Sequence, residues 1–216
     1  MVVEPLSLIL GAVGAALGVV SDRFATRWPP HDDEEHPPGR RADWRTVTCG
    51  IVGAVALGLL PQRFAGDGLA LPVFGAWFVT LIVGLATDLD SRTLPDELTL
   101  PVIAIGLLYA LSGMNPLVGG EVGLAILAAV LIPAVLYLPS IPFGAGAFGL
   151  GDVKLLAGMG LLLGGERALG GTLFGLILAG VVLLVLLVAR RVDRRSYVPF
   201  GPFLIIGALW AVLIRG

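Results

Sequence analysis

The chain has 216 residues, of which 56% are hydrophobic and only 14% are charged, and its formal net charge is −2. A soluble domain carries about 25% charged residues, so this composition excludes an ordinary soluble protein and indicates a polytopic membrane protein. The single cysteine, Cys49, excludes an intramolecular disulfide and a zinc site built from several cysteines.

Eight apolar segments follow one another along the chain, and we expect them to be the transmembrane helices of one all-α domain covering residues 1–216. The segments are residues 5–21, 46–60, 71–87, 98–112, 121–139, 152–164, 169–189 and 199–214. Several are shorter than the roughly 20 residues that a perpendicular span needs, and the shortest are 46–60, 98–112 and 152–164. Whether these three cross the membrane fully is therefore left open.

Residues 22–45 form the one long polar stretch, which is rich in proline and charge and is expected to be a flexible cytoplasmic loop. His31 and His36 flank an acidic run in it. Nothing rigid orients these side chains, so the pattern favours a solvated acidic loop over a metal site. Elsewhere, small residues such as Gly14 and Gly18 are expected to let helices approach closely.

Lysine and arginine fall unequally on alternate loops. With eight spans, one side carries Arg23, Arg27, Arg40, Arg41, Arg45, Arg92, Lys154, Arg190, Arg191, Arg194 and Arg195, and the other carries Arg63, Arg167 and Arg215. Positively charged loops stay in the cytoplasm, so the first side is predicted to be cytoplasmic and both termini to be outside. Asp88 and Asp152 then lie on the same, cytoplasmic side.

These two aspartates suggest chemistry because of where they stand. Asp88 directly follows the third apolar segment, and Asp152 begins the sixth. A carboxylate in the hydrocarbon region costs roughly 2.5–3.5 kcal/mol on insertion scales, so it indicates function. Two carboxylates that share one proton can act together as base and acid on a water and a peptide carbonyl. Gly149 and Gly151 leave room for a substrate backbone and permit unusual backbone angles.

Other interpretations stay open at this point. Aspartate is a favoured N-cap, so Asp152 and Asp96 could each cap the helix that follows. Asp90 is the nearest competitor of Asp88. Lys154 could tune the carboxylate pair, orient a substrate or mark the membrane boundary. Intramembrane carboxylates also serve as proton relays in transporters, and a non-enzymatic component of a pilus or secretion machine would need no such pair.

Three stretches of the chain resemble the signatures of bacterial type IV prepilin peptidases, the GxGD-type membrane aspartic peptidases of family A24. Residues 88–101, Asp-Leu-Asp-Ser-Arg-Thr-Leu-Pro-Asp-Glu-Leu-Thr-Leu-Pro, resemble the first signature. Residues 149–156, Gly-Leu-Gly-Asp-Val-Lys-Leu-Leu, resemble the GxGD signature, and residues 198–204 resemble a third. The order and spacing agree over about residues 71–214.

The resemblance implies that Asp88, seven residues before Pro95, and Asp152 are the catalytic pair. It implies removal of a short basic leader from prepilin or pseudopilin precursors, without a cofactor, at the cytoplasmic face of the inner membrane. The expected partners are those precursors and membrane lipids, with no nucleic acid. The residues expected to bind substrate or support the pair are Gly149, Gly151, Lys154, Asp90 and Pro95.

The chain departs from the family in two places. Many members carry a zinc-binding domain with two CxxC pairs in the first cytoplasmic loop, whereas residues 22–45 contain no cysteine, which indicates a short form without that domain. Many members also methylate the new N-terminus with S-adenosylmethionine. Residues 18–23 only loosely resemble the region linked to that activity, so methylation, and with it this cofactor, is left open.

Overall fold

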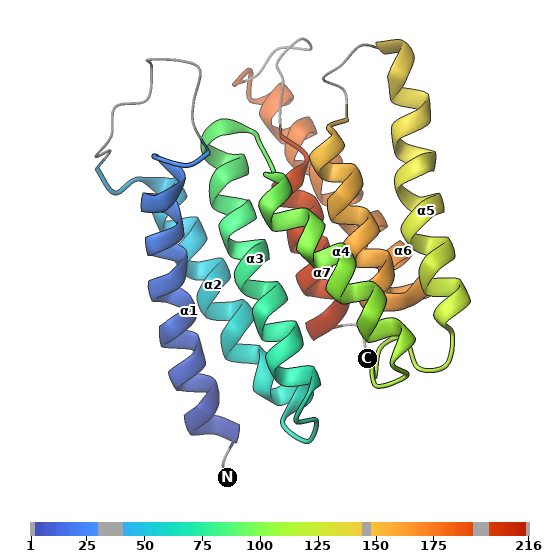
Figure 1. Cartoon of the computed structure of the whole chain (residues 1–216). Helices are drawn as coiled ribbons and strands as arrows, with labels where there is room; N and C mark the ends of the chain where they lie inside the picture. The colour runs from blue at the N-terminus through green and yellow to red at the C-terminus, as the bar shows by residue number, and fades with distance from the viewer. Residues whose placement is uncertain (1–2, 30–40, 144–147, 192–198, 215–216) are drawn as a thin grey trace. The chain divides into compact units, whose positions relative to one another are not determined.

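The computed structural model describes residues 3–29, 41–143, 148–191 and 199–214, and every regular element within these ranges is helical (Figure 1). In chain order the elements are α1 (Val3–Ala25), α2 (Trp44–Phe64), α3 (Ala70–Ser91), α4 (Asp96–Leu111), α5 (Val122–Tyr137), the short 3₁₀ helix η1 (Leu138–Phe143), α6 (Leu150–Val188) and α7 (Gly201–Leu213). An α-helix satisfies its own backbone polar groups, as hydrocarbon requires. The prediction of an all-α fold is confirmed.

Among the described residues, five helical stretches are long and apolar enough to cross a membrane. They are Glu4–Ala25, Trp44–Phe64, Ala70–Ser91, Val122–Ile141 and Leu150–Val188. Helix α2 has 21 residues and extends beyond the predicted segment 46–60 at both ends. Helices α4 and α7, with 16 and 13 residues, fall below the roughly 20 residues of a perpendicular span. The structure thus supports an integral membrane protein.

The predicted loop 22–45 is shortened by the helices on both sides of it. Helix α1 continues to Ala25, and α2 begins at Trp44 with Asp43 as its N-cap. The flexibility of the loop and the interpretation of His31 and His36 concern residues 30–40, which lie outside the described residues.

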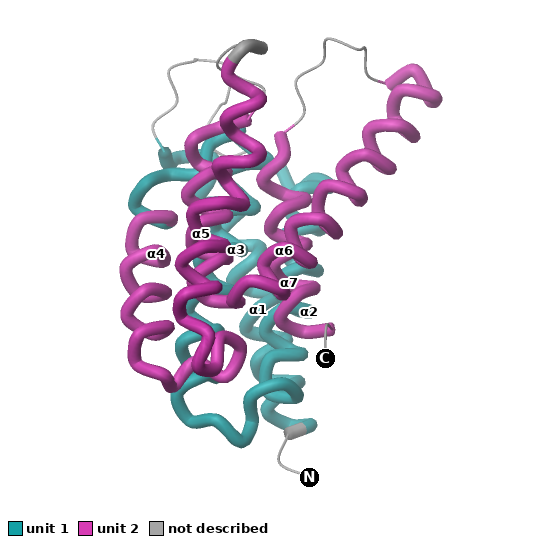
Figure 2. Tube along the Cα trace, turned by 90° about the vertical axis from the view of Figure 1, so that its right-hand side faces the viewer, with its two compact units in different colours: residues 1–98, 216 teal, residues 99–215 magenta. Residues whose placement is uncertain are grey.

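The chain divides into two compact units, residues 1–98 with residue 216, and residues 99–215, coloured separately in Figure 2. In the first unit α1, α2 and α3 pack together. A Cβ on Gly14 would collide with the carbonyl of Gly53, and one on Gly18 with the carbonyl of Cys49. The backbones of α1 and α2 therefore touch where only glycine fits, as the packing role of these residues predicts. A single domain over residues 1–216 stays a prediction.

In the second unit α6 is interrupted at Gly164, whose φ of 75° and ψ of 177° are not helical. The chain turns back there, so the halves 150–163 and 165–188 run in opposite directions (Figure 1). The first half packs on α5, where Gly160 meets the backbone of Ala129, and the second packs on α7, where Gly171 meets Gly207. The predicted segments 152–164 and 169–189 correspond to these two halves.

A buried side chain supports the interruption. The carbonyl of Leu162 would accept from the N–H four residues later in a continuous helix, but Gly164 breaks that series. The side-chain amide of Asn115, which is 1% exposed, donates to this carbonyl at 3.0 Å. Its own oxygen accepts from the N–H of Leu117 at 2.9 Å. Asn115 thus fixes the end of the half-helix that carries Asp152.

Replacing Gly164 by alanine should lower the thermal unfolding midpoint of the purified protein in detergent, measured by scanning fluorimetry. Its φ and ψ lie in a region that is essentially restricted to glycine, and forcing a side chain there costs on the order of 1–3 kcal/mol. Gly180→Ala in the same helix is the control, because a Cβ at Gly180 meets no atom within 4 Å. An unchanged midpoint for Gly164→Ala would contradict the importance of this turn.

Candidate active site

Asp88 lies in the last turn of α3 and is 5% exposed. Its backbone carbonyl accepts from the N–H of Arg92 at 3.1 Å. Arg92 has a φ of 57°, the left-handed conformation that commonly ends a helix. Asp88 is therefore a buried carboxylate at a helix end. Pro95, seven residues later, is also buried, and its carbonyl accepts from the N–H of Leu98 at the start of α4.

Asp90, two residues after Asp88, forms an ion pair with α2. Nη1 of Arg45 lies 2.8 Å from Oδ1 of Asp90, and the side chains are 25% and 1% exposed, respectively. Breaking a buried pair of this kind by removing one partner is strongly destabilising, because it leaves a charge without compensation. Asp90 therefore has a structural task that links α3 to α2.

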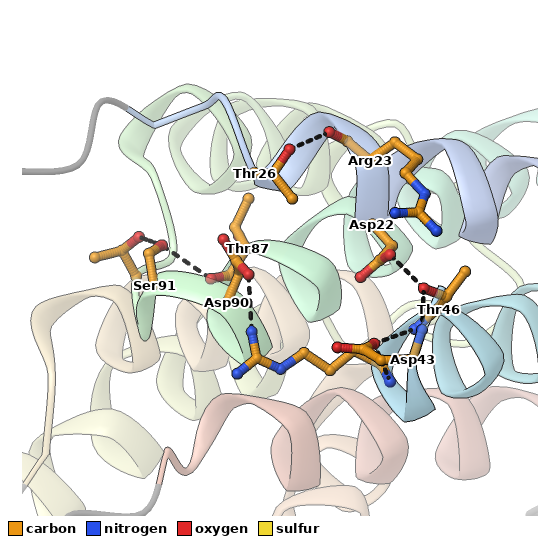
Figure 3. Close-up of polar contacts among 10 residues, drawn as sticks. Asp22, Arg23, Thr26, Asp43, Thr46, Thr87, Asp90 and Ser91 are labelled. Carbon is orange, nitrogen blue, oxygen red and sulfur yellow. Dashed lines mark hydrogen bonds and ion pairs between the residues drawn. The ribbon is translucent and has the colours of Figure 1, made fainter. Parts of the chain in front are cut away.

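The start of α2 is itself held by a polar network (Figure 3). Oδ1 of the N-cap Asp43 accepts from the backbone N–H groups of Arg45, at 2.9 Å, and of Thr46, at 3.3 Å. The hydroxyl of Thr46 donates to Oδ2 of Asp22 in α1 at 2.7 Å, and Asp22 is 1% exposed. Side chains thus connect α1 to α2 and α2 to α3 at the end of the unit that carries Asp88.

Asp152 lies in the first turn of α6 and is 9% exposed. The helix begins at Leu150 with Gly149 as its N-cap, so Asp152 is the third helical residue and not the cap. Its Oδ2 accepts from the backbone N–H of Gly149 at 3.2 Å. A carboxylate at this position also interacts favourably with the helix dipole. Asp152 therefore has a local structural role beside any catalytic one.

The glycines before Asp152 do not have the unusual backbone angles that the sequence suggests. Gly149 has a φ of −81° and a ψ of 153°, which any residue adopts, and Gly151 lies within α6. A Cβ at Gly149 would lie 3.4 Å from Oδ2 of Asp152, an ordinary van der Waals distance, so no clash with that carboxylate requires a glycine here. Lys154, half-buried, follows in the same turn.

The third signature stretch lies beside the GxGD stretch in the second unit. The rings of Phe148, next to Gly149, and Phe200, next to the start of α7, have centroids 6.4 Å apart in a tilted arrangement, a distance typical of interacting aromatic pairs. Residues about fifty positions apart in the sequence therefore meet at the start of α6.

Sequence reasoning misses the polar network of the first unit. It counts Arg45 only as a cytoplasmic charge and does not connect Asp22, Asp43 or Thr46 with one another. The spacing of Asp43 and Thr46, a cap followed three residues later by a polar partner, is the local signal of the capping box that they form. The contacts of Arg45 with Asp90 and of Thr46 with Asp22 are tertiary and have no such signal.

The two aspartates predicted as a pair lie in different units. Asp88 belongs to the first unit and Asp152 to the second.

Long apolar helices with buried carboxylates at their ends indicate an integral membrane protein. The model of the type IV leader peptidase family matches residues 74–188, a range that includes both Asp88 and Asp152. The chain belongs to this family.

Curated relatives agree with the match. Proteins named prepilin leader peptidase/N-methyltransferase are similar to this chain in Burkholderia pseudomallei, at 33% identity over 79% of this chain and 54% of the relative, and in Aeromonas hydrophila, at 30% over 79% and 56%. A protein of the same name in Pectobacterium carotovorum is 34% identical over 69% and 53%. The chain spans about half the length of the curated relatives it matches. No solved structure matches.

Proposed function

We propose that this protein is a membrane aspartic endopeptidase that removes the leader of type IV prepilin-like precursors, with Asp88 and Asp152 as its catalytic pair. The observation that carries the proposal is that both aspartates are buried at helix ends inside the region that matches the leader peptidase family. The names of the relatives support prepilins as the substrates.

In the proposed reaction water is activated between the two carboxylates. The ionised carboxylate takes a proton from the water, and the protonated one donates a hydrogen bond to the carbonyl of the peptide bond that is cleaved. Two carboxylates that share one proton do this without a cofactor or a covalent intermediate. The hydrogen bond from Gly149 orients the Asp152 carboxylate at the start of its helix.

We further propose eight membrane crossings with both termini outside and the catalytic pair at the cytoplasmic face of the inner membrane. The reversal of α6 at Gly164 supports counting its halves as two crossings. Helices α4 and α5 separate Asp88 from Asp152. If each of them crosses once, the two aspartates return to the same face, which is the face where arginine accumulates.

The position of the aspartates favours a peptidase over a proton-coupled transporter. Transporters bind substrate and ions near the bilayer midplane, whereas Asp88 lies in the last turn of its helix and Asp152 in the first turn of its own.

N-methylation, which is part of the relatives' names, stays a prediction for this chain. Gly18, in the region linked to it, lies in α1 against the carbonyl of Cys49.

Asp88→Asn and Asp152→Asn should each reduce cleavage by roughly 10²- to 10⁴-fold, the usual contribution of a positioned acid or base. The measurement is the mobility shift of a co-expressed prepilin with a basic leader, at matched membrane levels of enzyme. Asp67→Asn is the control, because Oδ1 of Asp67 accepts from the N–H groups of Leu69 and Ala70 at the start of α3 and the side-chain oxygen of asparagine can accept the same bonds. Full processing of the prepilin by either Asp88→Asn or Asp152→Asn would refute the assignment of that aspartate to the catalytic pair.

The proposed orientation can be tested with a membrane-impermeant maleimide, because the only native thiol is the buried Cys49. In a Cys49→Ser background we expect Gly66→Cys, in the exposed turn between α2 and α3, to be labelled in intact spheroplasts. Thr93→Cys, exposed after the end of α3, should be labelled only after permeabilisation. The opposite pattern would invert the topology.

A further inference from the structure

The ion pair between Arg45 and Asp90 holds the last turn of α3. Asp90 is almost completely buried, and its Oδ1 lies 2.8 Å from Nη1 of Arg45. Asp88 belongs to the same turn, so a constraint on Asp90 also constrains the rotation of the turn that carries Asp88. Arg45, unlike Asp90, lies outside the three sequence stretches that resemble the family.

Arg45 is itself well anchored, so it can act as a fixed point. Its backbone N–H is bound by the N-cap Asp43, and its guanidinium lies 5.8 Å from the ring centroid of Trp44, within the range of a cation–π contact. The next residue, Thr46, is bound to the buried Asp22 of α1. The arginine thus projects from a helix start that is held by its own N-cap and by α1.

Helix geometry connects this anchor with the direction of Asp88. Successive helical residues are about 100° apart at 3.6 residues per turn, so side chains two positions apart point to nearly opposite sides and do not face each other. Because Asp90 points to Arg45 on α2, Asp88 is directed away from α2. Releasing Asp90 would free α3 to rotate or unwind at its last turn and would change the direction of Asp88.

We propose that Arg45 is a positioning residue of the peptidase site, which acts through Asp90 to orient Asp88. This inference rests on the proposed function, because it assumes that Asp88 takes part in cleavage. Arg45 need not touch the substrate. It should therefore affect turnover more than substrate binding.

The test compares kcat and KM for cleavage of a purified prepilin with a basic leader, expressed per mole of folded enzyme in detergent. Arg45→Met and Asp90→Asn should each lower kcat by about 10- to 100-fold, the effect of displacing a catalytic group by about 1 Å. KM should stay within about twofold, because Arg45 does not touch the substrate. Its loss therefore leaves unchanged the contacts that bind the substrate equally in the ground state and the transition state. Arg45→Lys, which keeps the charge, should have a kcat between those of Arg45→Met and wild type.

The double variant Arg45→Met/Asp90→Asn separates positioning from simple stability. It removes both charges, so it leaves no buried charge without compensation and is expected to unfold near the wild-type midpoint. Its kcat should nevertheless be as low as that of the single variants, since all three lack the same contact. Arg41→Met is the control, because Arg41 is an exposed arginine four residues before Arg45, and it should match wild type.

Wild-type kcat in Arg45→Met or in the double variant would overturn the positioning role while leaving the proposed function intact. A low kcat in Arg45→Met that the double variant restores to the wild-type value would likewise show that the arginine matters only for stability. Failure of the proposed function looks different, because Asp88→Asn would then cleave the prepilin as wild type does.

Discussion

The physical constraint on which this structure depends is the cost of keeping carboxylates buried at the ends of apolar helices. The protein meets it differently at each position. Asp90 is compensated by Arg45 across a 2.8 Å contact, Asp22 accepts from the hydroxyl of Thr46, and Asp152 accepts from the N–H of Gly149 in the first turn of its own helix. These contacts hold three of the described carboxylates in fixed directions, which is the preorganisation that a catalytic site needs.

Much of the fold follows from the sequence because its signals are local. Long apolar runs predict helices, and the all-helical structure confirms this. The segments 152–164 and 169–189 are predicted as separate because polar residues and glycines stand between them, and the structure places the break at Gly164. Helix ends are less predictable, since α1 and α2 take residues 22–25 and 44–45 from the predicted loop. There, capping by Asp43 and the buried contact of Asp22 outweigh the polar composition.

Within the candidate site, sequence reasoning identifies residues more readily than it identifies their contacts. Asp88 and Asp152 are conspicuous because charge is rare in apolar segments. The pair of Arg45 and Asp90 joins residues 45 positions apart, and no periodicity predicts such a contact. For the glycines of the GxGD stretch, the sequence predicts a feature that the structure does not have. Their presence suggests unusual backbone angles, yet Gly149 is extended, and what it contributes is the backbone N–H from which the Asp152 carboxylate accepts.

The central claim is that Asp88 and Asp152 work as a pair, so the most direct measurement is of their proximity. In a Cys49→Ser background, Asp88→Cys and Asp152→Cys can be combined and treated with a short bifunctional maleimide in membranes. A protease site engineered between the two positions would then report an intramolecular cross-link on a gel. The account predicts efficient cross-linking of this pair and none for Asp67→Cys with Asp152→Cys, because Asp67 lies at the opposite end of α3 from Asp88. Absence of the 88–152 cross-link, with both thiols reactive to a single maleimide, would contradict a shared site.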